Sequence, residues 1–400
     1  MISHDAEVLI IGAGPAGAVA AYDLAVRGIR VLVLERSSFP RYKVCGGGLT
    51  HKVLQEFPFD VLPVVETTIR SIRFSRKHRQ VFTRSFLDPV LYCTMRSRLD
   101  EFLLGKALAA GAGVIFEQKV TRVAETKEGC EVSCGSGTYR SSLVIGADGA
   151  SGITSVNAGL RSHLEPGLAW EAELKAEPAA LEQYRETVFL DWGTFPGGYA
   201  WLFPKRDHVS VGVGGPARLS QRMLPYYERF IRSLEPGILT GETISRKAWP
   251  IPVRTAKSRF HAGRILVTGD AGGLSDPLTG EGIYYAVKSA RMAASACADW
   301  LDSRSGTLDS YSDRVNEELM KELLTAGKIR NLFNAIPGKI HGWVESRDRV
   351  WGAMAKVLRG ERNYRDVKKR FGRWSFLWGP AISLSLLISR VKERIYMLQR

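Results

Sequence analysis

The chain has 400 residues, 45% hydrophobic and 24% charged, a balance that excludes a disordered chain and a fibrous protein. Its 56 Lys and Arg outnumber 41 Asp and Glu, and the net charge of +15 favours anionic partners such as a diphosphate or a phospholipid surface. No recognisable nucleic-acid module accompanies this charge, so nucleic acid is not an expected partner. Five scattered cysteines indicate reduced thiols in a cytoplasmic protein, and Cys130 and Cys134 lack a second ligand pair, so no metal site is expected.

Residues 6–36 have the pattern of a strand, a glycine turn, a helix and a second strand. Within them Gly12, Gly14 and Gly17 have the GxGxxG spacing. Gly12 permits the tight turn, Gly14 lets the backbone approach a pyrophosphate, and Gly17 lets helix and strand pack closely. Glu35 follows Gly17 by 18 residues, where a carboxylate can accept a hydrogen bond from a ribose. This unit predicts a dinucleotide site and leaves FAD and NAD(P) both open.

A loop and a set of strands follow this unit. The sequence PRYKVCGGG at 40–48 interrupts what would otherwise be a second strand–helix unit, so we expect an open loop there. Residues 69–74, 80–86 and 90–95 alternate as strands, and 98–110 form an amphipathic helix.

Short strands then lead to an acidic turn. Residues 114–116 form a strand, and 118–125 with 129–134 have the pattern of a hairpin. Residues 141–145 form a buried strand that ends in GADGAS, which contains Asp148.

The second half of the chain begins as a run of strands and ends as helices. Four strand-like segments fall within 167–215, with no helix between the last three, which predicts an antiparallel sheet. Residues 216–239 have a helical pattern, and 243–253 return to the sheet. An apolar strand and a Gly- and Asp-rich loop precede a long helix that begins near Gly282, and 308–400 are helical, basic and aromatic.

Three turns together identify the cofactor as FAD. They are GAGPAG with Glu35, GADG with Asp148 and Gly149, and TGDAGG with Asp270. Asp270 is expected near a ribityl hydroxyl, while the helix that begins near Gly282 aims backbone N–H groups at the edge of a flavin ring. NAD has no such tail. The alternative for Asp270 is an ordinary helix N-cap.

We therefore expect an α/β protein with a Rossmann-like FAD-binding domain, an inserted antiparallel-sheet substrate domain and a helical C-terminal region. The expected segments are FAD-binding parts at 1–75, 96–165 and 259–305, substrate-domain strands at 76–95, the antiparallel-sheet substrate domain at 166–258, and the basic C-terminal region at 306–400.

The order of these turns resembles the p-hydroxybenzoate hydroxylase superfamily of FAD enzymes over residues 6–300. Within that superfamily, PRYKVCGGG at 40–48, YAWLFP at 199–204 and GVG at 212–214 resemble the geranylgeranyl reductase family. The aromatic hydroxylases usually carry His in the loop after the GD aspartate, whereas this chain has DAGGLSDPLTGEG, and this departure weighs against a hydroxylase.

The resemblance implies a set of FAD-contacting residues. Arg96 and Arg98 compete for one position, and Arg96 is preferred because RxxLD, with Leu99, reproduces the family's RxxFD spacing; either arginine could equally be a solvated charge at a helix start. The implied residues are Ala16, Glu35, Cys45, Gly46, Gly48, Arg96, Val120, Asp270, Gly282 and Ile283, to which the motifs add Gly12, Gly14, Gly17, Arg36 and Asp148.

Cys45 is the candidate catalytic residue. In the family the equivalent cysteine lies on the substrate side of the flavin, where a thiol could protonate an alkene carbon, relay electrons or gate the pocket. Lys43 and neighbouring backbone N–H groups could lower its pKa. The alternative is a small packed hydrophobe, the commoner fate of a free cysteine.

Tyr199, Trp201 and Phe203 alternate with period two, so they share one side of a strand. They are candidate substrate residues as the wall of an apolar tunnel that fits a polyprenyl chain, and the resemblance favours this interpretation. As core residues they would need no further explanation.

The C-terminal sequence carries a second indication of lipid. Residues 373–394 combine aromatic and aliphatic side chains with Arg and Lys, and Gly379–Pro380 make the apolar run too short to span a membrane. Two interpretations stay open, an interfacial segment that binds anionic lipid and a helix docked on the body of the enzyme.

The resemblance implies an FAD-dependent reductase that saturates C=C bonds of a polyprenyl group, carried by a lipid or a diphosphate, by hydride transfer from reduced flavin. Cys45 or an ordered water would supply the proton. The electron donor would be NADPH or ferredoxin. The alternative is a flavin monooxygenase that acts on an apolar substrate through a C4a-peroxide. We expect a cytoplasmic protein, either free or peripheral on the inner face of the membrane, and the oligomeric state stays open.

Overall fold

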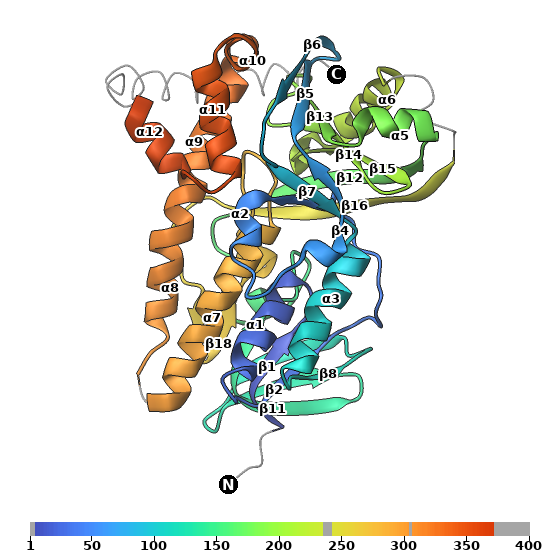
Figure 1. The fold of residues 1–400 in the computed structure, drawn as a ribbon. Helices are drawn as coiled ribbons and strands as arrows, with labels where there is room; N and C mark the ends of the chain where they lie inside the picture. The colour runs from blue at the N-terminus through green and yellow to red at the C-terminus, as the bar shows by residue number, and fades with distance from the viewer. Residues whose placement is uncertain (1–4, 235–241, 304–305, 372–400) are drawn as a thin grey trace.

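The computed structural model describes residues 5–234, 242–303 and 306–371. In Figure 1 the sheet that contains the first strands occupies the lower part of the molecule, a second sheet lies above it, and the C-terminal helices stand along one side of both. The expected α/β architecture, with a Rossmann-like part, a second sheet and C-terminal helices, is confirmed.

The lower sheet is built on five parallel strands. Buried Val, Leu and Ile side chains of these strands lie on both faces of the sheet, as expected for strands that are covered on both faces. Every neighbouring pair along this series is parallel. Their order is β18 (Ile265–Val267), β11 (Gly137–Gly146), β1 (Ala6–Ile11), β2 (Val31–Leu34) and β8 (Gly113–Ile115).

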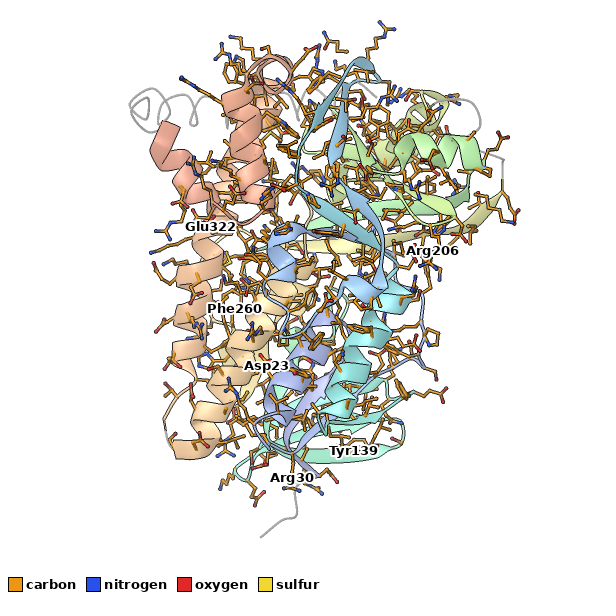
Figure 2. The ribbon with its side chains drawn as sticks, viewed as in Figure 1. Asp23, Arg30, Tyr139, Arg206, Phe260 and Glu322 are labelled. Atoms are coloured by element: carbon orange, nitrogen blue, oxygen red, sulfur yellow. The ribbon has the colours of Figure 1, made fainter. Side chains whose placement is uncertain are left out.

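Alternate residues of β1 bury two different faces. Val8 and Ile10 pack against the helical face, made by α1 (Pro15–Ala25), α3 (Arg96–Ala109) and α7 (Ile283–Ser303). Leu9 and Ile11 pack against the other face, where β9 (Val120–Glu125) and β10 (Cys130–Cys134) continue the sheet as the expected hairpin. An ion pair between Asp23 of α1 and Arg291 of α7 joins two helices far apart in the sequence (Figure 2).

The upper sheet has seven strands in the described part of the chain. Neighbours are antiparallel, as expected, except that β13 and β5 are parallel, because β5 joins from a distant part of the sequence and no hairpin constrains its direction. The order is β16 (Thr243–Arg254), β12 (Leu164–Lys175), β15 (His208–Pro216), β14 (Tyr199–Pro204), β13 (Thr187–Trp192), β5 (Ser71–Arg76) and β6 (Arg79–Ser85).

One face of the upper sheet is covered by helices. These are α5 (Pro178–Tyr184) and α6 (Met223–Arg232), which pack on the even-numbered residues of β12. The helix expected at 216–239 is a 3-10 segment, Ala217–Arg222, followed by α6, and 235–241 lie outside the described residues. The odd-numbered residues of β12 are left to face the interior between the two sheets.

A small third sheet connects the two large ones. It consists of β3 (Gly48–Thr50), β7 (Leu91–Thr94) and β4 (Val65–Ile69), and α2 (His51–Leu54) follows β3. The early strands therefore divide between this sheet and the upper one. The division of the chain into six segments stays a prediction.

The C-terminal region is helical as far as it is described. Its helices are α8 (Asp309–Val315), a π-helical turn (Asn316–Met320), α9 (Lys321–Ala335), α10 (Pro337–Ser346), α11 (Asp348–Leu358) and α12 (Tyr364–Phe371).

Hydrogen bonds join these helices to the upper sheet and to one another. The His341 imidazole of α10 donates to the Gln80 carbonyl of β6 over 2.6 Å, and α10 lies beside β6 in Figure 1. Glu322 of α9 accepts the backbone N–H of Tyr364 over 2.7 Å (Figure 2). In the described ranges every helix is too short or too polar to cross a bilayer. The aromatic and basic segment at 373–394 lies outside the described residues.

Candidate active site

A cavity of about 1970 Å³ runs between the two large sheets and the C-terminal helices. Small-ligand pockets usually measure ~300–1000 Å³, so this one has room for a cofactor and a second, elongated molecule. Its walls include Gly14 of the glycine turn, Cys45, Asp270, and the helical residues Trp343 and Met354.

The glycine turn has the geometry that its spacing predicts. Gly12 has φ +94°, and a Cβ there would lie 2.6 Å from the Ala147 oxygen, while a Cβ on Gly17 would lie 1.8 Å from the Gly12 oxygen. A Cβ on Gly14 would instead have no neighbour closer than 3.9 Å, and the atoms at that distance are guanidinium nitrogens of Arg41 and Arg96. The backbone at Gly14 is thus accessible and has two cationic side chains beside it, an arrangement that suits a pyrophosphate.

Glu35 is buried at the end of β2 and is held by backbone donors. Its Oε2 accepts the Ala13 N–H over 2.7 Å, and its Oε1 accepts the Ser37 N–H over 3.1 Å. These bonds leave carboxylate lone pairs for a ribose hydroxyl. Arg36 also lines the cavity, with its guanidinium 5.9 Å from the Trp249 ring centroid.

The structure separates the two competing arginines. Arg96 is buried and lines the cavity, and its Nε and Nη2 each donate to Asp100 over 2.8 Å. Burial opposes the charge, but Asp100 raises the pKa of Arg96 above its usual range. Arg98 points elsewhere, with Nη1 3.1 Å from Glu66 and 39% of its side chain exposed. Arg96 therefore fits the cofactor side, and Arg98 belongs to the surface.

Asp148 and Val120 also line the cavity. The Asp148 Oδ2 accepts both the backbone N–H and the hydroxyl of Thr154, over 2.9 and 2.8 Å. Its Oδ1 is buried without a hydrogen-bond partner among the described residues, and burial raises the pKa of this carboxyl. A ligand hydroxyl or amide at this point would satisfy Oδ1.

The loop before α7 surrounds Asp270. The Ser275 hydroxyl donates to the Asp270 Oδ1 over 3.2 Å, and a Cβ on Gly282 would approach the same oxygen at 3.3 Å. Gly280, with φ +74°, and Ile283, the first residue of α7, are further cavity residues. The N-terminus of a 21-residue helix therefore opens toward the cavity beside a carboxylate, as a flavin and its ribityl chain require.

Side chains of α2 and α12 hold this loop in place. The Tyr364 hydroxyl donates to the Asp276 Oδ2 over 2.7 Å, and the Asp276 Oδ1 accepts the Leu278 N–H over 2.7 Å. Lys52 lies 2.6 Å from the Glu281 carboxylate. Burial lowers the pKa of Lys52, but Glu281, Asp276 and Tyr284 together raise it, so the net direction is upward. The C-terminal helix α12 and the short helix α2 thus position the start of α7.

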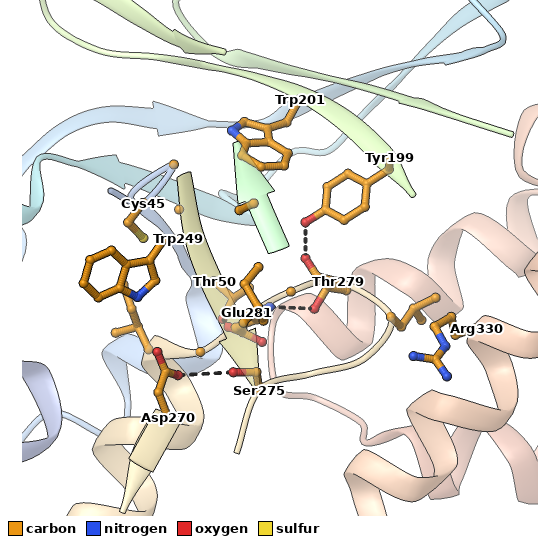
Figure 3. Close-up of a pocket in the computed structure, with 18 of the residues that line it drawn as sticks. Cys45, Thr50, Tyr199, Trp201, Trp249, Asp270, Ser275, Thr279, Glu281 and Arg330 are labelled. Atoms are coloured by element: carbon orange, nitrogen blue, oxygen red, sulfur yellow. Dashed lines mark hydrogen bonds between the residues drawn. The ribbon is translucent and has the colours of Figure 1, made fainter. Parts of the chain in front are cut away.

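The Cys45 loop enters the cavity from the opposite side. Figure 3 shows Cys45 beside Trp249, across the cavity from Tyr199. The Gly47 N–H donates to the Cys45 Sγ over 3.4 Å, and Gly47 is the residue with positive φ, +65°. The Lys43 Nζ lies 4.0 Å from the Trp249 ring centroid, and burial, followed by Arg96, lowers the pKa of Lys43 to about 8.

An aromatic wall is formed by Tyr199, Trp201 and Phe203, which all line the cavity. A Cβ on Gly212 would lie 2.2 Å from the Trp201 Cζ2, so the GVG segment leaves room for the indole. A Cβ on Gly46 would lie 2.5 Å from Phe203, so the CGGG loop packs against the same wall. The two motifs therefore meet in space. The Tyr199 hydroxyl donates to the Thr279 carbonyl (Figure 3).

The cavity continues into an apolar extension that no motif indicates. It lies between the upper sheet and the C-terminal helices, whose contacts depend on tertiary packing alone. The residues of this apolar extension are Phe74, Leu190, Leu332, Phe333, Ile340, Trp343, Val344, Val350, Met354, Val357 and Leu358.

Glu171 is a cavity residue that the motif analysis missed. It is 1% exposed, and its Oε1 accepts the Cys45 N–H over 3.0 Å. Burial, followed by repulsion from Glu173, raises the pKa of Glu171 to about 7. The signal in the sequence is the alternation of β12, which places residues 169, 171 and 173 on the face turned away from α5 and α6.

The comparisons with known proteins agree with this geometry. A family model for the FAD binding domain matches residues 5–321. A digeranylgeranylglycerophospholipid reductase of Methanothermobacter thermautotrophicus is 30% identical over 82% of this chain and 88% of its own length. The chain belongs to the geranylgeranyl reductase family. It is an FAD-dependent oxidoreductase.

A further relative and a solved structure are also similar to this geranylgeranyl reductase family member. The chloroplastic geranylgeranyl diphosphate reductase of Nicotiana tabacum is 31% identical, over 73% of this chain and 66% of the tobacco protein. The crystal structure of a geranylgeranyl bacteriochlorophyll reductase-like protein from Thermoplasma acidophilum superimposes with a TM-score of 0.75, at 22% identity, over 92% of this chain and 98% of that one. At that identity the likeness shows the fold.

Proposed function

We propose that this geranylgeranyl reductase family member saturates C=C bonds of a polyprenyl chain. The observation that carries the proposal is the continuity of the cavity, whose walls include both the residues that fit FAD and the apolar extension. An aromatic wall followed by a long apolar channel suits a flexible isoprenoid better than a compact aromatic substrate. The names of the relatives point to the same substrate class.

FAD, when bound and reduced, supplies the hydride. The chain's own residues hold and orient it: Gly14 and Arg96 at the pyrophosphate, Glu35 at the ribose, and Asp270 with the N-terminus of α7 at the ribityl and flavin end. The positive end of α7 favours negative charge on the reduced ring.

The substrate side is expected to position the chain and keep water out. Tyr199, Trp201 and Phe203 would hold the reacting double bond, while the apolar extension takes the remainder of the isoprenoid. Arg330 and Arg347 line the same cavity, and their charges suit the anionic end of a lipid or diphosphate.

Cys45 remains the candidate catalytic thiol of the proposal. It lines the cavity, and the Gly47 N–H donates to its sulfur. Cys45→Ser keeps the size of the side chain and removes the thiol, so turnover is expected to fall if the sulfur acts in the reaction. Unchanged turnover of Cys45→Ser with normal FAD content would assign the residue to packing.

An anaerobic experiment tests the function. The FAD-loaded protein is reduced with dithionite and mixed with geranylgeranyl substrates, and the flavin absorbance is followed together with the product mass. We expect reoxidation of the flavin with the gain of two hydrogens per double bond. Reoxidation without that mass gain, or no reoxidation, would refute the proposal. NADPH and ferredoxin, the predicted donors, can then be compared in place of dithionite.

A further inference from the structure

We propose that Glu171 donates the proton that completes reduction of each double bond, and that Glu173 and His208 return a proton to it from solvent. This inference rests on the proposed function, because every C=C bond that accepts a hydride also needs a proton. It moves the task of proton donor from Cys45 or an ordered water to Glu171, and leaves to Cys45 the roles of electron relay or gate of the pocket.

Glu171 lies at the cavity, next to the aromatic wall in the register of the sheet. Its side chain lines the cavity, and in the cross-strand register Glu171 faces Gly212, which in turn faces Trp201 of the aromatic wall. Gly212 has no side chain to separate the two. Cys45 donates its N–H to one carboxyl oxygen, Oε1. The other, Oε2, is buried with no hydrogen-bond partner among the described residues. A carboxyl proton there is not held by another side chain of the described residues.

A series of polar groups follows Glu171 outward along β12 and β15. Glu173 lies two residues further along β12, on the same face as Glu171, and is 2% exposed. Its Oε2 is 3.2 Å from the His208 Nε2, and the His208 Nδ1 is 2.6 Å from the Asp207 Oδ1. The side chain of Asp207 is 83% exposed. Glu173 and His208 therefore lie between Glu171 and the exposed Asp207.

The charges around this series keep a proton available near neutral pH. Burial followed by Glu173 raises the pKa of Glu171 to about 7. Burial lowers the pKa of His208, but the contacts with Glu173 and Asp207 together raise it by more. The pKa of His208 is therefore raised above its ordinary value. The groups that face the Glu171 carboxyl are Glu173 on β12, Lys205 at the end of β14, Ser210 on β15, Lys247 opposite on β16, Tyr199 on β14, and Tyr42 and Cys45 on the loop.

Neighbouring donors are less suited to the task. The Tyr199 proton is engaged by the Thr279 carbonyl, and burial raises the pKa of Tyr199 above its usual range. The Lys205 ammonium donates to the carbonyls of Gly46 and Thr94 over 2.6 and 3.0 Å. Lys205 is therefore a fixed counter-charge for the carboxyls, which lowers the pKa of Glu171.

Each reduced double bond needs one hydride and one proton, and groups named above supply both. The alkene gains a hydride from reduced flavin at one carbon and the Glu171 proton at the other, so its π bond breaks and two C–H bonds form. The flavin is left oxidised and Glu171 is left as a carboxylate. Protonated His208 then restores the Glu171 proton through Glu173, and His208 takes a proton from water beside Asp207.

The activity test uses the anaerobic single-turnover assay on the FAD-loaded full chain. Glu171→Gln keeps the shape and removes the acid, so product formation is expected to slow by ~10²–10⁴-fold. Glu182→Gln, an exposed carboxyl of α5, is the matched control and keeps the wild-type rate. His208→Asn is expected to keep the first-turnover rate and slow later turnovers in excess dithionite. A wild-type rate in Glu171→Gln would overturn the donor, and undiminished later turnovers in His208→Asn would overturn the route.

A second readout does not depend on turnover. Infrared difference spectra of the protein without substrate should show a protonated carboxyl band that titrates near pH 7, is missing from Glu171→Gln and persists in Glu182→Gln. A spectrum unchanged by Glu171→Gln would overturn the inference. A wild type that shows the band but leaves geranylgeranyl substrates unreduced would overturn the proposed function and not the buried acid.

Discussion

Replacing Glu171 by Gln should change the pH dependence of stability in a direction that the structure defines. Burial followed by Glu173 raises the pKa of Glu171 from 4.5 to about 7 on folding. At a pH between these two pKa values, Glu171 is protonated in the folded protein and ionised in the unfolded chain. Stability therefore falls as the pH rises through this window, and the loss is complete above the folded pKa.

The size of the effect follows from the same two values. One pKa unit corresponds to about 1.36 kcal/mol, so the interval from 4.5 to about 7 amounts to about 3 kcal/mol of unfolding free energy. Glu171 is 1% exposed, so solvent screens its interactions little. Gln cannot ionise, so the variant should escape this loss.

The measurement compares urea unfolding of wild type, Glu171→Gln and the control Glu182→Gln at about pH 5 and about pH 8. Near pH 5 the wild-type carboxyl is protonated and Gln resembles it, so the two should have similar stability. Near pH 8 Glu171→Gln should be more stable than wild type, by up to about 3 kcal/mol. A difference of equal size at both pH values, or one that favours wild type at the higher pH, would refute the reasoning.

Two further predictions concern the cofactor and the aromatic wall. Arg96→Lys retains a charge for Asp100 but loses the forked guanidinium, so FAD affinity should fall about 10- to 100-fold in fluorescence titrations of the apoprotein, whereas Arg98→Lys should bind FAD normally. An equal loss in both would contradict the separation of the two arginines. Gly212→Ala places a Cβ 2.2 Å from Trp201, so unfolding free energy should fall by about 1–3 kcal/mol and polyprenyl turnover should drop, while Gly135→Ala, in open space, should do neither. Wild-type stability and turnover in Gly212→Ala would show that the indole moves freely.

The sequence by itself determined the parts of this protein that depend on local chemistry. The glycine spacing around Gly12, Gly14 and Gly17 indicated a dinucleotide, and the turn at Asp270 indicated FAD, because each requirement is met within a few consecutive residues. Short motifs such as PRYKVCGGG and YAWLFP indicated the family for the same reason. The period-two pattern of Tyr199, Trp201 and Phe203 correctly placed the three side chains on one face.

The tertiary structure decided what depends on contacts between distant segments. It placed Arg96 in the cavity and Arg98 against Glu66, although the two stand two residues apart in one helix. The tertiary structure also formed the apolar extension. Its residues on α10 and α11 line the cavity only because these helices pack against the upper sheet. It brought the Glu171 carboxyl to Cys45, 126 residues away in the chain. No sequence motif marks a buried carboxyl in a strand of alternating pattern. The pKa and reactivity of such a group depend on neighbours that come close only in the folded protein.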